Sequence, residues 1–131
     1  MKWVSKGKRK KYSIKRFFKS FVYAFNGILS AFKTEQNLLV QTIFGIIVIG
    51  LGFFLKLSNV ELVIVILTCG LVIALELVNT AIEYVVDMAM PEIHPLAKIA
   101  KDVAAGAVLI TAFTAFIVGL IIYLPKIIAL F

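Results

Sequence analysis

The chain has 131 residues, enough for one domain, and 62% of them are hydrophobic while only 16% are charged. Together with a mean hydropathy of +1.04, this composition excludes an ordinary soluble domain and indicates an integral membrane protein. The single cysteine, Cys69, excludes an internal disulfide and gives no sign of an oxidising compartment.

The net charge of +7 is concentrated near the N-terminus. Ten of the fourteen Lys and Arg residues lie within residues 1–33, and no acidic residue accompanies them there. Beside apolar segments, such a basic block favours a cytoplasmic end that faces lipid headgroups over a segment that binds nucleic acid. We therefore predict a basic leader over residues 1–13 and a cytoplasmic N-terminus.

Residues 14–33 have the pattern of an amphipathic helix. When residues are advanced by about 100° each, the Phe, Ile and Leu side chains fall on one arc, and Lys15, Arg16 and Lys19 fall on the opposite side. An apolar face with a cationic opposite face is typical of a helix that lies in the membrane interface. Docking of this helix on protein is the alternative that the pattern leaves open.

Three apolar runs follow, each close to or above the roughly 20 residues that cross about 30 Å of hydrocarbon. We predict transmembrane helices over residues 38–55, 62–86 and 103–124. With a cytoplasmic N-terminus, the connection 87–102 returns to the cytoplasmic side, and Lys98 and Lys101 in it agree with this orientation.

The second apolar run carries a stripe of polar residues. Glu76, Asn79, Thr80, Glu83 and Asp87 are spaced so that they share one face of a helix, and the rest of its circumference is apolar. Glu76 lies eleven residues before Asp87, about 16 Å deeper at about 1.5 Å per residue. Polar groups at this depth normally face a protein interior or a wet cavity and mark a functional site.

More charged residues reach the same membrane face, because Glu35 precedes the first run and Lys101 and Asp102 precede the third. Carboxylates in such a cluster suit Mg²⁺, and a lysine beside them suits a phosphate, as phosphoryl transfer requires. Proton or cation translocation is an equal alternative, and polar packing between helices is a third. Because three helices cannot readily surround the polar stripe, we also expect a homo-oligomer.

The run from Glu76 to Asp87, ELVNTAIEYVVD, followed by Ala100-Lys101-Asp102, resembles the prokaryotic diacylglycerol kinase family of small bacterial membrane lipid kinases. The resemblance extends over about residues 12–125. It implies an all-α homotrimer in the bacterial inner membrane, with three transmembrane helices and an amphipathic surface helix in each chain. It also implies that MgATP is used to phosphorylate a lipid hydroxyl at the cytoplasmic face.

The resemblance further implies roles for individual residues. Glu76 matches the base that takes the hydroxyl proton, Asn79 matches a residue close to the catalytic centre, and Asp87 matches a supporting residue at the cytoplasmic rim. Glu35 and Glu83 match the residues that hold the metal. The nucleotide site is assigned to Arg16, Tyr23, Glu35, Glu83, Glu92, His94, Lys101 and Asp102.

The residues after Lys101 and Asp102 bear on the substrate. Val-Ala-Ala-Gly-Ala-Val, residues 103–108, is similar to the Gram-positive branch of the family, whose members resemble undecaprenol kinases. The resemblance therefore implies phosphorylation of undecaprenol. A diacylglycerol kinase that makes phosphatidic acid is the alternative within the same class. A small cation- or proton-coupled carrier that uses Glu76 and Glu83 is the alternative from another class.

Overall fold

The computed structural model describes residues 12–131, so the predicted basic leader lies almost entirely outside the described residues. The described part is all-α, as predicted, and contains four helices: α1 (Ile14–Thr34), α2 (Gln36–Phe54), α3 (Asn59–Ala89) and α4 (Pro95–Ile128). By length and hydropathy, α2, α3 and α4 could each cross a membrane. The prediction of three membrane-spanning helices is therefore confirmed.

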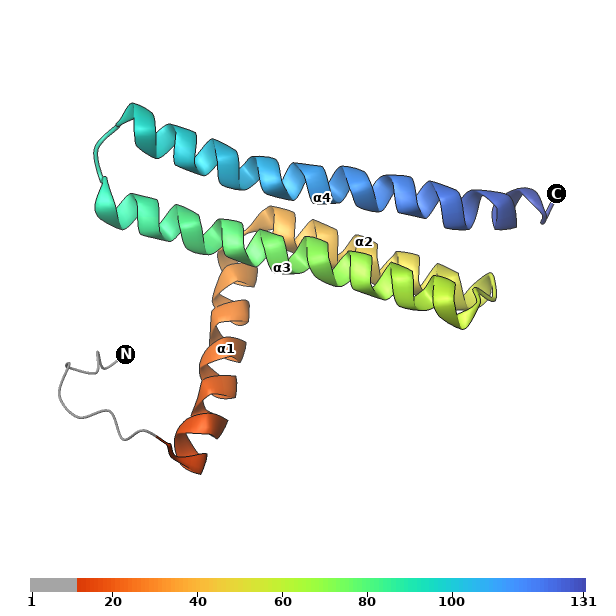
Figure 1. The fold of residues 1–131 in the computed structure, drawn as a ribbon, viewed down its shortest axis with the longest axis horizontal. Helices are drawn as coiled ribbons and strands as arrows, with labels where there is room; N and C mark the ends of the chain where they lie inside the picture. The colour runs from red at the N-terminus through yellow and green to blue at the C-terminus, as the bar shows by residue number, and fades with distance from the viewer. Residues whose placement is uncertain (1–11) are drawn as a thin grey trace.

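The three long helices run side by side, and α3 packs against both α2 and α4 (Figure 1). α1 crosses their direction and meets them at its C-terminal end (Figure 1). A small apolar core joins the long helices around Val65 of α3 and Ile122 and Tyr123 of α4. We call the end of the bundle at residues 55–58 the turn end, and the end at residues 90–94 the loop end.

A tight turn at the turn end connects α2 to α3. The N–H groups of Leu57 and Lys56 donate to the carbonyls of Gly52 and Phe53, at 3.1 and 3.2 Å. This is the Schellman pattern of helix termination, and Lys56 adopts the left-handed conformation (φ 57°) that the pattern needs. Gly52 is buried here, and a Cβ on it would lie 2.9 Å from both Leu57 Cδ1 and Tyr123 Oη.

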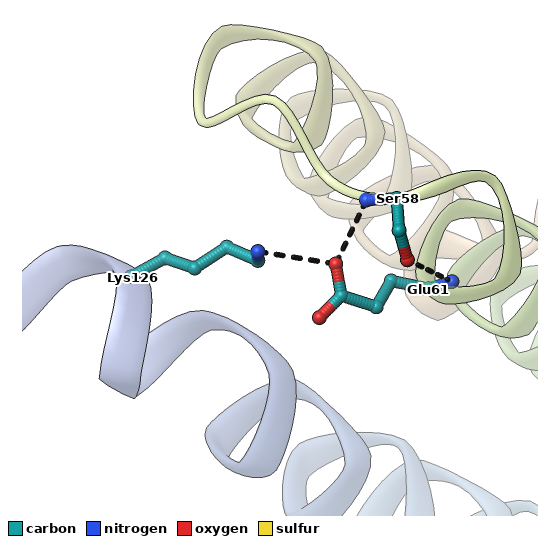
Figure 2. A network of polar contacts seen from close by, with 3 residues as sticks. All are labelled: Ser58, Glu61 and Lys126. Carbon is teal, nitrogen blue, oxygen red and sulfur yellow. Dashed lines mark hydrogen bonds and ion pairs between the residues drawn. The ribbon is translucent and has the colours of Figure 1, made fainter.

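The first turn of α3 is held by a capping box that also reaches α4 (Figure 2). The Ser58 hydroxyl accepts the N–H of Glu61, and Glu61 Oε2 accepts the N–H of Ser58 at 2.8 Å. The same carboxylate oxygen pairs with Lys126 Nζ at 3.1 Å. One side chain thus satisfies the start of α3 and ties it to the end of α4.

At the loop end, α4 begins with His94 as its N-cap and Pro95 at its first turn. The His94 Nδ1 atom accepts the N–H of Leu96 at 3.1 Å, and proline in the first turn needs no hydrogen bond of its own. The connection between α3 and α4 is therefore short, and most of the predicted connection 87–102 is helical.

The helices are longer than the apolar runs that predicted them. The second run, 62–86, lies within α3, and the third, 103–124, lies within α4, which continues past Pro125 to Ile128. Hydropathy marks the part of a helix suited to hydrocarbon, whereas caps decide where the helix ends. Pro125 removes one N–H near the helix end and does not stop the helix there.

Candidate functional site

The inner part of the polar stripe of α3 faces the interior of the chain. Glu76, Asn79 and Thr80 have exposed fractions of 2%, 7% and 4%, and they are the buried polar residues of the described range. The Thr80 hydroxyl donates to the Glu76 carbonyl at 3.0 Å, so it is satisfied within its own helix. Glu76 and Asn79 are left as the groups whose side chains must find partners elsewhere.

Glu76 finds its partner on the neighbouring helix. Gln41 of α2 donates a hydrogen bond from Nε2 to Glu76 Oε2 at 3.2 Å. A hydrogen bond to a carboxylate in an apolar environment holds the orientation of that carboxylate. One oxygen of the Glu76 carboxylate is thus held by α2, and the arrangement suits a carboxylate that is to receive a proton.

Gln41 is a residue of the site that the sequence analysis missed. A signal was available, because Gln41 is an amide in the otherwise apolar run 38–55, and polar groups inside such runs usually have a partner on another helix. Its Oε1 atom is buried and has no hydrogen-bond partner. The amide is therefore only half satisfied.

One turn farther along α3, Asn79 Nδ2 donates to Glu83 Oε1 at 3.4 Å. The contact is long, and Asn79 Oδ1 is buried without a partner. Glu83 is half-buried, so its carboxylate can be reached from outside the helix pair. The pair presents an orphaned amide oxygen and a carboxylate, which are both acceptors suited to a hard cation or a donor group.

At the loop end, ion pairs involve both α3 and α4. Lys101 Nζ pairs with Asp87 Oδ1 across the two helices, and Lys98 pairs with Asp102 within α4. The Asp87 side chain is 62% exposed, whereas Glu76 is 2% exposed. The acidic residues of α3 thus run from a buried carboxylate to an exposed one.

Glu35 lies at the corner between α1 and α2, where it ends one helix and begins the next. The Tyr84 hydroxyl of α3 donates to Thr34 Oγ1 at 3.4 Å. Because Thr34 precedes Glu35 and Tyr84 follows Glu83, this contact brings the corner beside the outer part of the polar stripe. Of the predicted residues that precede α2, Glu35 is the one that the structure places near α3.

The remaining predicted residues lie farther away. Arg16 and Tyr23 belong to the first part of α1, which runs away from the three long helices (Figure 1). Glu92 is exposed in the connection at the loop end, and His94 caps α4 through its ring nitrogen. A single chain therefore does not bring Arg16 and Tyr23 to Glu76.

The carboxylates do not by themselves form a metal cage. Residues 12–131 contain no group of three or more His, Cys, Asp or Glu side chains that could hold a metal ion. Mg²⁺ does not need such a cage, because it commonly binds one or two carboxylates and completes its shell with water and substrate phosphates. The exposed side of Glu83 and the orphaned Asn79 oxygen fit that mode of binding.

Comparison with known proteins shows which family this chain is similar to. A sequence model of the prokaryotic diacylglycerol kinase family matches residues 22–123. The undecaprenol kinase of Bacillus subtilis is 47% identical over 86% of this chain and 92% of its own length. A diacylglycerol kinase of Synechocystis is 46% identical over 85% of this chain and 64% of its own length. The diacylglycerol kinase of Escherichia coli K12 is 30% identical over 78% and 84%.

Proposed function

The chain belongs to the prokaryotic diacylglycerol kinase family and is a membrane lipid kinase, and we propose that it transfers the γ-phosphate of MgATP to the hydroxyl of undecaprenol. The observation that carries the chemistry is Glu76, a carboxylate 2% exposed in an apolar helix pair and held by Gln41. The match to an undecaprenol kinase over nearly the full length of both chains supports the substrate.

The stripe on α3 suggests how the reaction is divided. Glu76 accepts the proton of the lipid hydroxyl, whose oxygen forms a bond to the γ-phosphorus. At the same time the bond between the γ-phosphorus and the bridging oxygen breaks, and ADP leaves with that electron pair. The buried position of Glu76 suits a lipid that arrives from the bilayer, and the exposed position of Asp87 suits the aqueous rim.

Glu83 is proposed to hold Mg²⁺ together with Glu35, and Asn79 lies close enough to Glu83 to assist. When bound, Mg²⁺ supplies charge neutralisation for the phosphates. Lys101 and Asp102 are proposed to contact the nucleotide.

The other predicted nucleotide contacts, from Arg16, Tyr23, Glu92 and His94, belong to the same proposal. Since Arg16 and Tyr23 lie away from Glu76 within one chain, their part in the site requires either movement of α1 or a neighbouring copy.

A homotrimer is part of the same proposal. Within the chain, only 11% to 17% of the apolar window of each spanning helix is buried, and the Asn79 oxygen is orphaned. Helices with so little buried surface need lipid or another protein copy against most of their area.

We propose that α1 lies in the interface of the cytoplasmic membrane of a bacterium. In support, Phe17, Phe18 and Phe21 are exposed on α1, where their rings could enter lipid. The basic N-terminal residues and the active site would then face the cytoplasm.

A two-substrate assay tests the function. The purified protein is placed in lipid vesicles with labelled ATP, Mg²⁺, and either undecaprenol or diacylglycerol. We expect label in undecaprenol. Preferential labelling of diacylglycerol would reverse the substrate assignment. Diacylglycerol is the alternative substrate because related proteins are diacylglycerol kinases. Label in neither lipid would favour the carrier.

The assay is repeated with Glu76→Gln, which should abolish phosphate transfer while leaving nucleotide binding in place. Glu61→Gln is the matched control, because Glu61 is a carboxylate of the same helix at the turn end. Transfer by Glu76→Gln at the wild-type rate would remove the base from the proposal.

A further inference from the structure

An apolar cleft of about 490 Å³ opens between α2, α3 and α4. On α2 its lining extends from Gln41 to Leu51, which is about 15 Å at about 1.5 Å per residue. On the antiparallel α3 it extends from Val72 to Val65. The cleft is therefore an elongated groove along the helices, with Gln41 and Val72 at the end nearer the loop end.

The two hydroxyl groups along the groove have partners. The Thr68 hydroxyl donates to the Ile64 carbonyl at 2.7 Å, and the Tyr123 hydroxyl donates to the Val48 carbonyl at 2.7 Å. Gln41 Oε1, in contrast, is buried without a partner. An acceptor without a donor is costly in an apolar environment. Because Oε1 is enclosed, the Gln41 side chain, which lines the groove, must turn toward the groove before Oε1 can accept a hydrogen bond from a hydroxyl group there.

The same end of the groove adjoins the proposed catalytic carboxylate. Val72 lines the groove, and Glu76 lies one helical turn beyond it on α3. Gln41 spans this step, because it lines the groove and donates to Glu76. A long apolar chain lying in the groove would therefore place a terminal hydroxyl beside both side chains.

We propose, on the basis of the proposed function, that this groove binds the hydrocarbon chain of the lipid alcohol and that Gln41 binds its hydroxyl. The Gln41 amide turns toward the arriving hydroxyl, which donates to Oε1. Rotation about its C–O bond then turns the same hydrogen toward Glu76, whose other oxygen is held by Gln41 Nε2. Gln41 thus selects for a hydroxyl at the end of an apolar chain and positions the base that receives its proton.

A second copy of the chain is the competing occupant of the groove. The substrate is favoured because the groove is continuous with the catalytic carboxylate and ends at an unpaired acceptor, which an apolar helix face would leave unpaired. The two occupants differ in their consequences. If the substrate occupies the groove, a side chain that fills it hinders a long lipid more than a short one. If a second copy occupies the groove, the same side chain disturbs assembly.

Glycines allow the groove to be filled without a clash. Gly119 lines the groove, and a Cβ built on it meets nothing within 4 Å. Gly119→Leu should raise the KM for undecaprenol about tenfold while changing the KM for farnesol, a short prenyl alcohol, much less. Gly50→Leu is the matched control, because Gly50 also has open space around its Cβ but does not line the groove.

Equal losses with both alcohols, or a Gly119→Leu protein that changes its oligomeric state on gel filtration, would assign the groove to a second copy and overturn the proposal.

Gln41→Met keeps the side-chain length but removes the hydrogen bonds. It should raise the KM for the lipid alcohol about three- to tenfold with an unchanged KM for ATP. Thr42→Val is the control, because Thr42 is the next residue of α2 and loses only a bond to its own helix. A Gln41→Met enzyme with a wild-type KM for the lipid would refute the role of Gln41.

Photocrosslinking separates this inference from the proposed function, because it measures binding without phosphate transfer. A prenyl alcohol with a diazirine in its chain should label peptides that line the groove, and Gly119→Leu should remove this label. If the wild-type protein transfers no phosphate but the probe labels these peptides, the proposed function is wrong and binding of the lipid in the groove is supported. If the protein transfers phosphate but the probe labels only other peptides, the proposed function is supported and binding of the lipid in the groove is refuted.

Discussion

Gly52 should be the glycine least able to accept a side chain. A Cβ at this position would lie 2.9 Å from Tyr123 Oη and 2.9 Å from Leu57 Cδ1. The leucine methyl is the far end of a flexible side chain and can move. The tyrosine is 7% exposed and its hydroxyl donates to the Val48 carbonyl at 2.7 Å, so it can move only by giving up that hydrogen bond.

The expected cost combines three contributions. Replacing glycine by alanine within a helix gains about 0.5–1 kcal/mol. Overpacking a well-packed position costs about 1–3 kcal/mol, and loss of the tyrosine hydrogen bond costs about 0.5–1.5 kcal/mol. Gly52→Ala should therefore lower the free energy of unfolding by about 1–3 kcal/mol. Gly50→Ala, where the Cβ meets open space, should raise it slightly.

The measurement is a denaturant titration of the detergent-solubilised protein, followed by circular dichroism. A double-mutant cycle with Tyr123→Phe adds a sharper test. Without the tyrosine hydroxyl the alanine methyl has room, so Gly52→Ala should cost less in the Tyr123→Phe background. Equal free energies for Gly52→Ala and Gly50→Ala, or strict additivity in the cycle, would refute the reasoning.

Three further predictions concern the loop end and the polar stripe. Lys101→Met should raise the KM for ATP in steady-state kinetics, whereas Asp87→Asn, which breaks the same ion pair, should not. Equal effects of the two substitutions on this KM would show that the ion pair matters only for structure. Glu83→Gln should raise the Mg²⁺ concentration needed for half-maximal rate, and an unchanged Mg²⁺ titration would exclude it as a ligand. His94→Ala should destabilise α4 by about 1 kcal/mol through loss of its cap, while His94→Asn should retain most of the stability in thermal unfolding.

The sequence by itself determined the local features of this protein. Apolar run length indicated three spanning helices, and a helical period placed Glu76, Asn79 and Glu83 on one face, which is buried at Glu76 and Asn79. These features depend on hydrophobicity and on the geometry of a single helix. The capping signal Ser58-x-x-Glu61 was also readable, although hydropathy alone placed the start of α3 too late.

Only the tertiary structure decided which residues face one another. Gln41 is thirty-five residues from Glu76 in sequence, and their hydrogen bond depends on how α2 packs on α3. The pairing of Lys101 with Asp87 and the departure of α1 from the bundle depend likewise on contacts between helices. The period of a helix sets which side chains share a face. The packing of several helices sets what that face meets, and no single segment of the chain contains that information.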